Sequence, residues 1–455
     1  MEHIHLIGIG GTGLSAIARL LLERGYQVSG SDRAASTFTD ALQQAGARIF
    51  IGHQAENITG ADVVVRSSAV TEDNPEVQAA RAASIPVYKR SEFLGKLLNG
   101  FVSLAVAGTH GKTTTTAMLA WALEDAGYSP SYIIGGVAKN MGNNAHAGKG
   151  PYFVIEADEY DGMFLGLTPD WAIVTNMEHD HPDCYPTPDD YVRAFSAFVS
   201  RIKPQGGLFI CGDEASLNVL PAHLPAAAEA FTYGLQGGNS YQATHLSLDA
   251  EGNCCFNVLY RGELLIDAKL PIPGEHNVRN ALAVIGICHQ SGVDLNKVVA
   301  ALSTFSGTGR RFDVAGTACG ITLIDDYGHH PTEIKATLQA ARSRYGDRRI
   351  WAIWQPHTYS RTQTLAQDFI KAFVNADQVV VTEVYAAREA ATGFSASQLV
   401  DAMPYKNKHF VPNLQTAVTY LKDNLQNGDV VLVLSAGDAN LISTQVLDYL
   451  KEKEQ

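Results

Sequence analysis

Two glycine-rich turns, each set between an apolar strand and a helix, constrain the fold of this chain more than any other feature. The first turn follows the run HIHLIGIG, which begins at residue 3, and the second follows FVSLAVAG, which begins at residue 101. Short β-rich runs alternate with amphipathic helical runs around them, and a further series opens with GITLIDDYGHHP at residues 320–331. Such alternation is typical of βαβ units that build parallel sheets.

We therefore predict an α/β protein of three domains, with a Rossmann-like domain at each end and a P-loop ATPase-type parallel sheet in the middle. The predicted ranges are 1–100, 101–312 and 313–455, and the length of 455 residues agrees with about three domains. RSEFLGKLLNG at residues 90–100 indicates a connector helix, and residues 243–270 alternate like hairpins around RGE.

Charge and composition exclude several classes of function. The net charge is −13 without clustered Lys and Arg, which argues against a nucleic-acid surface. No apolar run approaches the roughly 18 residues that cross a bilayer, and the start MEHIHLIGIGG does not resemble a secretory signal. Six cysteines lack a CxxC pair or framework spacing. We expect a cytoplasmic protein that is a monomer or weak homodimer and binds neither nucleic acid nor membrane.

The first turn carries the spacing G-x-G-x-x-G. Its glycines are Gly8, Gly10 and Gly13, with Gly11 between them, and Asp32 ends the next strand. Glycines let a backbone approach a pyrophosphate at a helix N-terminus, and an acid at this distance can bind a ribose. The pattern fits NAD or a UDP-sugar, and a βα turn without a ligand stays open as an alternative.

The second turn, GTHGKT, has the context of a phosphate loop. Lys112 would neutralise β- and γ-phosphate oxygens, the backbone amides would surround them, and the Thr113 hydroxyl would ligate Mg²⁺. The strict G-x-x-x-x-G-K-[ST] pattern requires glycine at position 106, where this chain has Val106. The sequence thus indicates a variant loop for ATP, with binding residues Gly108, Thr109, His110, Gly111, Lys112, Thr113 and Thr114.

Acids and imidazoles follow two later strands of the central domain. VIEADEYDG contains Glu156, Asp158 and Glu159, while VTNMEHDHPDCY contains Glu178 and His181 among its polar residues. Sites in parallel sheets lie at the carboxyl ends of the strands. Glu156, first after its strand, is the best candidate to hold Mg²⁺ with Thr113. The His-rich cluster would also suit zinc, but a phosphate loop in the same domain favours a second Mg²⁺.

Two further polar segments stand at the start of the last domain. GTGRRFD at residues 307–313 contains paired arginines, which suit phosphate or carboxylate oxygens, and DDYGHHP at residues 325–331 follows the next strand.

Together these motifs resemble the Mur ligase family of peptidoglycan synthesis. The resemblance rests on eight segments in order along nearly the whole chain: GIGGTG, AGTHGKTTTT, EADEYD, TNMEHDH, PGEHNVRNALA, GTGRRFD, DDYGHHPTEI and QPHTYSRT. One departure is Thr358, which stands where some of these ligases carry arginine and leaves Arg361 as the one cation of that segment.

The resemblance implies roles for individual residues. Lys112 and Thr113 take the phosphate-loop roles. Glu156 and His181 are similar to the family's Mg²⁺ ligands, and His181 is also predicted to be a catalytic residue. Asn277, Asn280, Arg311 and Asp326 match residues that complete ATP binding, whereas His330 and Arg361 match positions near the incoming amino acid.

The resemblance also implies a reaction. With ATP and Mg²⁺, the enzyme would ligate L-alanine to the lactyl carboxylate of UDP-N-acetylmuramate through an acyl phosphate, with His330 as a candidate base. A recycling ligase that joins a murein peptide to the same sugar is one alternative. An NAD-dependent oxidoreductase and an ATP-driven switch are alternatives of other classes. The oxidoreductase leaves the phosphate loop and both acidic clusters without a purpose, and the switch predicts ATP turnover without a small substrate.

Overall fold

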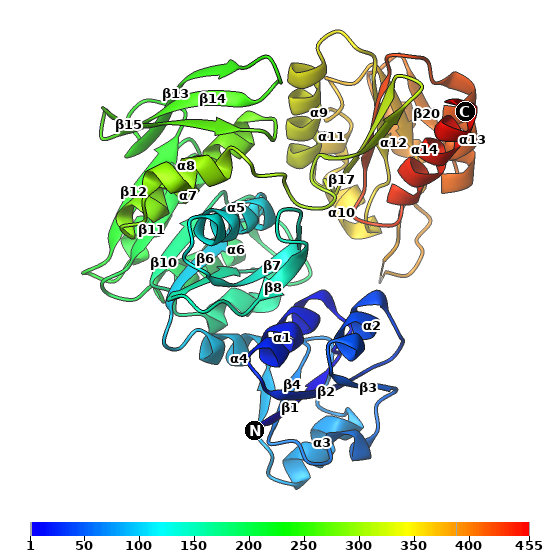
Figure 1. The fold of residues 1–455 in the computed structure, drawn as a ribbon. Coiled ribbons are helices and arrows are strands. Elements are labelled where there is room, and N and C mark those ends of the chain that lie inside the picture. The colour runs from blue at the N-terminus through cyan, green and yellow to red at the C-terminus, as the bar shows by residue number, and fades with distance from the viewer. Residues whose placement is uncertain (1, 388, 455) are drawn as a thin grey trace. The chain divides into compact units, whose positions relative to one another are not determined.

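The computed structural model describes residues 2–387 and 389–454, which are organised around three β-sheets with helices on their faces (Figure 1). Packing divides the chain into two compact units, and the first holds the five-stranded and ten-stranded sheets while the second holds the six-stranded sheet. The predicted α/β architecture with three sheet-based domains is confirmed.

The N-terminal sheet is wholly parallel, with strand order β3-β2-β1-β4-β5. Its strands are β1 (His3–Ile7), β2 (Gln27–Asp32), β3 (Arg48–Ile51), β4 (Val63–Arg66) and β5 (Val87–Lys89). Helices α1 (Thr12–Glu23) and α2 (Thr37–Gln44) lie on one face, and α3 (Pro75–Ala82) with η1 (Ala55–Ile58) lies on the other (Figure 1). The order reverses direction at β1, so the loop after β1 opens at the switch point where such sheets bind ligands.

The central sheet has the order β15-β14-β13-β12-β11-β10-β6-β9-β7-β8. The part nearest the phosphate loop is parallel and consists of β6 (Val102–Ala107), β9 (Tyr152–Glu156), β10 (Trp171–Val174), β11 (Gly207–Cys211) and β12 (Glu229–Gly234). On the other side of β9 lie β7 (Ser131–Ala138) and the antiparallel β8 (Asn143–His146), which the sequence had not indicated.

The helices of this region include the connector expected from the sequence. They are α4 (Arg90–Leu97), α5 (Lys112–Asp125), α6 (Pro188–Val199), α7 (Glu275–Gln290) and α8 (Leu295–Leu302), with the 3₁₀ segments η2 (Tyr160–Gly166) and η3 (Ala215–His223). The expected hairpin around RGE is present, because β14 (Cys254–Tyr260) and β15 (Glu263–Leu270) are neighbours joined by two residues. Arg261 and Gly262 both have positive φ, at 52° and 88°, as a two-residue type I′ hairpin turn requires. The preceding strand is β13 (Tyr241–Leu248).

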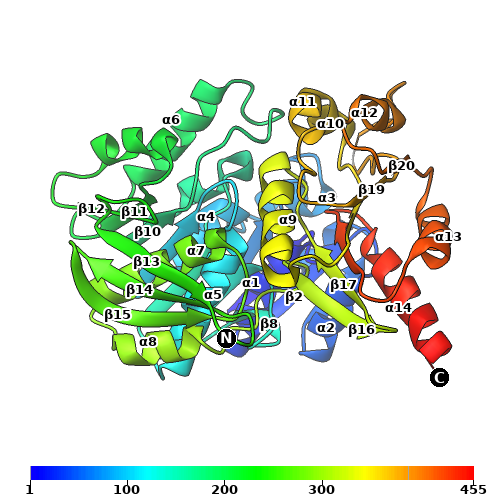
Figure 2. The same cartoon turned by 90° about the horizontal axis from the view of Figure 1, so that it is seen from above.

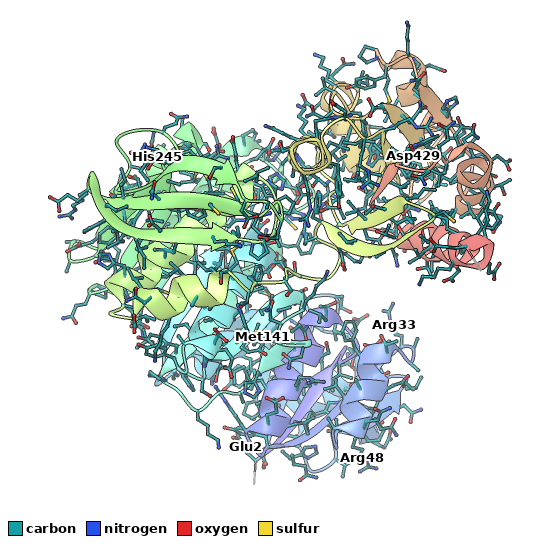
Figure 3. The ribbon with its side chains drawn as sticks, turned by 45° about the horizontal axis from the view of Figure 1, so that its top comes forward. Glu2, Arg33, Arg48, Met141, His245 and Asp429 are labelled. Carbon is teal, nitrogen blue, oxygen red and sulfur yellow. The ribbon has the colours of Figure 1, made fainter. Side chains whose placement is uncertain are left out.

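The C-terminal sheet has the order β16-β17-β21-β18-β19-β20 and is parallel except at β16. Its strands are β16 (Asp313–Ala318), β17 (Ile321–Asp326), β18 (Ile350–Trp354), β19 (Gln378–Val381), β20 (Lys408–Phe410) and β21 (Val430–Leu434). Asp429, labelled in Figure 3, precedes β21 and accepts hydrogen bonds from Arg349 and from the Trp351 indole.

Helices enclose this sheet on both faces (Figure 2). One core packs α9 (Pro331–Tyr345), α10 (Tyr359–Thr364), α11 (Ala366–Phe369) and α12 (Ser397–Ala402), and the other packs α13 (Leu414–Asn424) and α14 (Asn440–Glu454). Two apolar layers explain why β18 and β21 are continuous hydrophobic runs. Among the residues that the structure describes, no helix is both long and apolar enough to span a membrane.

Candidate functional site

The phosphate loop joins β6 to α5 through backbone conformations that only glycine adopts readily. Gly108 and Gly111 have φ values of 130° and 81°. A Cβ on Gly108 would lie 2.1 Å from Thr175 Oγ1, and one on Gly111 would lie 3.2 Å from Asn280 Oδ1. The Asn176 side chain accepts the His110 N–H at 2.8 Å. The loop is therefore shaped by the strand end at Thr175 and by Asn280 of α7.

Lys112 is held in an acidic, enclosed position. Its Nζ donates to the carbonyl oxygens of Gly108 and Thr109, at 2.6 and 3.0 Å, and lies 2.9 Å from Glu159 Oε2. Burial alone would lower the pKa of Lys112, but the carboxylates of Glu159 and Asp158 raise it. Lys112 is therefore a charged ammonium group in the loop, as phosphate neutralisation requires.

Thr113 and Glu156 lie side by side, as their places after β6 and at the end of β9 predict. Thr113 Oγ1 donates to Glu156 Oε1 at 2.9 Å, and the Gly135 N–H donates to Glu156 Oε2 at 2.6 Å. Burial raises the pKa of Glu156, and the charge of Lys112 acts in the opposite direction. A hydroxyl oxygen and a half-buried carboxylate form the kind of hard-oxygen pair that Mg²⁺ prefers.

The two histidines of the HDH segment have different partners. His179 Nε2 bonds to the Tyr185 carbonyl at 2.8 Å, whereas His181 Nε2 lies 3.6 Å from Glu159 Oε1. His181 also has a positive φ of 55°, a backbone conformation that is uncommon outside glycine. The shared partner Glu159 connects His181 to Lys112, and this geometry does not favour a zinc site made by both imidazoles.

The glycine turn of the N-terminal domain leaves the first turn of α1 uncapped. Gly8 has φ 86° and donates its N–H to the Ser31 carbonyl at 2.8 Å. Asp32 Oδ2 accepts the Gly10 N–H at 2.8 Å, so its carboxylate supports the turn. Gly11 is the exposed N-cap of α1 and provides no side-chain bond to the helix amides. These amides are available to an anion.

In the C-terminal domain, the two arginines of GTGRRFD differ in their contacts. Arg310 Nη2 donates to the carbonyls of Ser435 and Gly437, at 2.6 and 3.0 Å, which is a structural role. Arg311 Nη1 lies 3.2 Å from Glu333 Oε1. Burial would lower the pKa of Arg311, but the charges of Glu333 and Asp326 raise it.

Asp326 and His330 are both buried at the carboxyl end of β17. Asp326 accepts the N–H groups of Phe312 and Gly328, at 2.8 and 2.7 Å. His330 is the N-cap of α9, with Nδ1 accepting the Thr332 N–H at 3.4 Å. Because Nδ1 accepts, Nε2 carries the hydrogen of the neutral ring, and base chemistry at His330 would therefore require this capping bond to break.

Arg361 lies on α10 and is 9% exposed. Its Nη1 is 3.3 Å from His357 Nδ1. The preceding Thr358 has a positive φ of 62° and forms the N-cap of the helix without a side-chain bond. The QPHTYSRT segment is therefore a strained, buried turn that presents an arginine and a histidine together.

Three family models match consecutive parts of the chain. They are described as the Mur ligase family catalytic domain at residues 3–102, the Mur ligase middle domain at residues 106–288 and the Mur ligase glutamate ligase domain at residues 310–437. The chain belongs to the Mur ligase family. Each sheet falls within one of the three matches for most of its strands.

Curated Mur ligases match over almost their whole length. A UDP-N-acetylmuramate–L-alanine ligase of Desulfosudis oleivorans is 45% identical over 98% of each chain. The same-named enzyme of Caldanaerobacter subterraneus subsp. tengcongensis is 40% identical over 99% of this chain and 98% of its own.

Two solved structures show the same similarity. The UDP-N-acetylmuramate–alanine ligase of Thermotoga maritima has a TM-score of 0.83 and 31% identity over all of both chains. A murein peptide ligase of Psychrobacter arcticus has a TM-score of 0.71 and 27% identity over 99% of each chain.

The two glycine turns and the EADEYD, TNMEHDH and DDYGHHPTEI motifs lie at the ends of strands, as the sequence predicted. Asn280 packs at the phosphate loop beside Gly111, whereas Asn277 donates from Nδ2 to the Pro273 carbonyl at 2.7 Å. The ligand roles assigned to these and the other site residues stay predictions.

Three side chains that contact the site residues had no assigned role in the sequence analysis. Glu159 pairs with Lys112, Glu333 pairs with Arg311, and Arg90 contacts the first glycine turn. Glu159 and Glu333 lie within the EADEYD and DDYGHHPTEI segments, so membership of a motif was a usable signal for them. Arg90 lies within the connector helix, and no motif marks it.

Proposed function

We propose that this Mur ligase joins L-alanine to the lactyl carboxylate of UDP-N-acetylmuramate at the expense of ATP, in the synthesis of peptidoglycan precursors. The observation that carries the proposal is the phosphate loop with Lys112 paired to the buried Glu159, in a chain whose full-length relatives are named as ligases of this substrate pair. A murein peptide ligase is also similar in structure, so an experiment has to decide between L-alanine and a peptide as the second substrate.

The chemistry explains why a phosphate loop is needed. A carboxylate does not react with an amine at neutral pH because its leaving group would be an oxide. Transfer of the γ-phosphoryl group breaks the bond between the β,γ-bridging oxygen and the γ-phosphorus, releases ADP and forms an acyl phosphate. The amine nitrogen then attacks the acyl carbon, inorganic phosphate leaves, and an amide bond remains.

Residues of the central domain would position and neutralise the triphosphate. Lys112 would leave Gly108 and Thr109 to meet the phosphate oxygens, while the loop amides and Asn280 hold the nucleotide. Thr113 and Glu156 fit Mg²⁺, since their oxygens already converge at 2.9 Å, and His181 would add a ligand. When bound, Mg²⁺ supplies positive charge that offsets the phosphate oxygens and the surrounding acids.

The N-terminal domain, at residues 1–100, would bind the UDP-sugar, and the C-terminal domain, at residues 313–455, with Arg311 at its junction, would close over ATP and the amino acid. The glycine turn with Gly8, Gly10, Gly11 and Gly13 would receive the diphosphate of the UDP-sugar, with Asp32 supporting it. Arg311 and Asp326 would contribute to ATP binding, Arg361 would bind the amino-acid carboxylate, and His330 would accept the proton of the amine. We propose that the enzyme works as a monomer or weak homodimer.

A phosphate-release assay across amino acids and short peptides tests both the reaction class and the acceptor. We expect release only when ATP, Mg²⁺, UDP-N-acetylmuramate and L-alanine are all present. Strong turnover with ATP alone would support a nucleotide-driven switch, and preference for a murein peptide over L-alanine would support the recycling ligase. A nicotinamide cofactor bound to the purified protein would overturn the ligase proposal.

A further inference from the structure

Helix α10 takes the cap of its first turn from a distant loop. Glu389, in the loop that follows β19, directs both carboxylate oxygens at this turn. Its Oε2 accepts the N–H groups of Tyr359 and Ser360, at 2.6 and 3.0 Å, and its Oε1 accepts the Ser360 hydroxyl. One carboxylate therefore satisfies three donors at the start of the helix.

The helix needs this outside support because its own sequence provides little. It has six residues, which is well below the length at which a helix is stable by itself. Its N-cap, Thr358, has a φ of 62°, which is unfavourable for a β-branched residue, and within the described part of the chain it makes no side-chain bond to the helix. Such a conformation persists only where the surroundings impose it.

Contacts between the loops that follow β18 and β19 impose this conformation. The Tyr385 N–H donates to the Pro356 carbonyl at 2.8 Å, and the Thr358 N–H donates to the Tyr385 carbonyl at 2.9 Å. The rings of His357 and Tyr385 stack, with their centroids 5.8 Å apart. Glu389 extends this series of contacts to the helix itself.

Glu389 is an anion in this position. Burial would raise the pKa of Glu389, but the hydrogen bonds from Ser360 and Tyr359 and the charge of Arg361 lower it. The carboxylate is therefore ionised at neutral pH, as a strong acceptor for helix amides should be. Arg361 lies in the same turn as Tyr359 and Ser360, so the turn that Glu389 caps is the turn that presents the arginine.

We propose that Glu389 is a positioning residue for the amino-acid substrate, because its cap on α10 holds Arg361 in the orientation that receives the carboxylate of L-alanine. The inference rests on the proposed function, which assigns that carboxylate to Arg361. Glu389 acts through the helix and does not bind the substrate itself, since three donors of α10 already occupy its oxygens. The loop after β19 thus contributes to a site whose cation follows β18.

Steady-state kinetics of the full chain with L-alanine as the varied substrate tests this role. The carboxylate of the amino acid takes no part in bond formation, so its contact with Arg361 is the same before and during the reaction. Loss of that contact therefore weakens binding more than turnover. Glu389→Ala should raise KM for L-alanine about tenfold, while kcat and KM for ATP each change less than about threefold.

Glu389→Gln is the conservative variant that separates the cap from the charge. Its side-chain oxygen can accept the Tyr359 and Ser360 N–H groups, and its amide group can donate to the Ser360 hydroxyl. KM for L-alanine should therefore return to within about threefold of the wild-type value. Equal KM values in Glu389→Gln and Glu389→Ala would overturn the capping argument.

Two further results bear on the same role. If Glu389→Ala does not fold, Ser360→Ala replaces it in the test: it removes one of the three bonds and should raise KM for L-alanine by about two- to threefold, and an unchanged KM would overturn the proposal. A lower KM for L-alanine in Glu389→Ala would also overturn it, because the carboxylate would then compete with the substrate.

Glu383→Ala is the matched control. Glu383 also follows β19 and also supports a helix start, because it accepts the Ala396 N–H at 2.9 Å and the Ser395 hydroxyl at 2.7 Å directly before α12. That helix contains no residue with a proposed role, so KM for L-alanine should stay unchanged. An equal rise in KM in Glu383→Ala and Glu389→Ala would overturn the proposal, because it would indicate general loosening of the loop.

Failure of the proposed function would give a different result. If the wild type releases no phosphate with L-alanine in the presence of ATP, Mg²⁺ and UDP-N-acetylmuramate, the proposed function fails. If the wild type does release it and Glu389→Ala has the same KM for L-alanine, only this inference fails.

Discussion

Lys112 Nζ and Glu159 Oε2 are 2.9 Å apart, and Glu159 is 1% exposed. The Glu159 carboxylate is therefore the counter-ion of Lys112, the residue that neutralises phosphate oxygens in the proposed reaction. Glu159 also lies 3.6 Å from His181 through its other oxygen. One buried acid therefore sets the charge balance of two residues with proposed roles in ATP turnover.

Substitution of Glu159 by Gln should destabilise the fold at neutral pH, by about 3 kcal/mol, because it leaves Lys112 enclosed without its partner. Burial acts to raise the pKa of Glu159, but Lys112 and His181 lower it below its ordinary value of 4.5. The stabilisation is therefore complete above pH 4.5 and is lost as the pH falls through the lowered folded value. Urea unfolding of wild type and variant from pH 3 to pH 8 measures the difference.

The same titration separates this explanation from loss of packing. If the difference in unfolding free energy between wild type and Glu159→Gln stays constant down to pH 3, the pairing with Lys112 is not its source.

The sequence predicted the parts of the site that lie at ends of regular elements. Thr113 and Glu156 meet because β6 and β9 are parallel neighbours in which Val106 pairs with Glu156. Adjacent carboxyl ends of parallel strands are a general property of such sheets, so strand and loop assignment was enough. The three sheets were predictable for the same reason.

Contacts that depend on irregular backbone were not predictable in this way. Glu159 reaches Lys112 from the start of η2, where Asp161 and Gly162 have positive φ. No periodic signal encodes that geometry. Asp32 shows the converse difficulty, because its spacing suggested a ribose ligand while its carboxylate accepts the Gly10 N–H. A local pattern identifies an acid near a turn but not the partner it takes.

Substitution of Glu76 by Ala should destabilise the N-terminal domain strongly, by about 3–5 kcal/mol. Glu76 is fully buried, accepts from Ser31 and Asn57 at 2.6 Å and lies 3.3 Å from His5 Nε2. Burial would raise the pKa of Glu76, but its bonds to His5, Ser31 and Asn57 lower it. The stabilisation is thus present above pH 4.5 and lost in acid. Denaturant unfolding at pH 7 and pH 3.5 checks both statements.

Glu56→Ala is the matched control, since this glutamate is exposed on η1 of the same domain. We expect a small change only. A loss in Glu56→Ala equal to that in Glu76→Ala would contradict the burial argument.

Substitution of Glu156 by Gln should raise the Mg²⁺ concentration needed for half-maximal phosphate release about tenfold or more, because a half-buried anionic ligand becomes neutral. Thr113→Ala should act in the same direction, and removal of the metal with a chelator should abolish turnover of the wild type. Titration with Mg²⁺ at saturating ATP measures the shift. Unchanged Mg²⁺ dependence in Glu156→Gln would remove this carboxylate from the metal site.

Three substitutions of His330 distinguish a proton acceptor from a helix cap. His330→Asn retains an oxygen that can accept the Thr332 N–H, so α9 should keep its cap, whereas His330→Ala should lose about 1 kcal/mol of stability. If the imidazole accepts the proton of the amine, both variants should lower kcat by about 10²- to 10⁴-fold. His330→Gln, longer by one methylene, provides a second neutral replacement for the kinetic comparison.

The kinetic and stability measurements have to be read together. Loss of kcat in His330→Asn with an unchanged melting temperature assigns chemistry to the ring, because capping is preserved. If His330→Asn keeps full activity and His330→Ala is destabilised, the role of His330 is structural. Its hydrogen bond to the α9 backbone already shows that role. The proton would then pass to a different acceptor, since the amine of L-alanine must be neutral when it attacks the acyl phosphate.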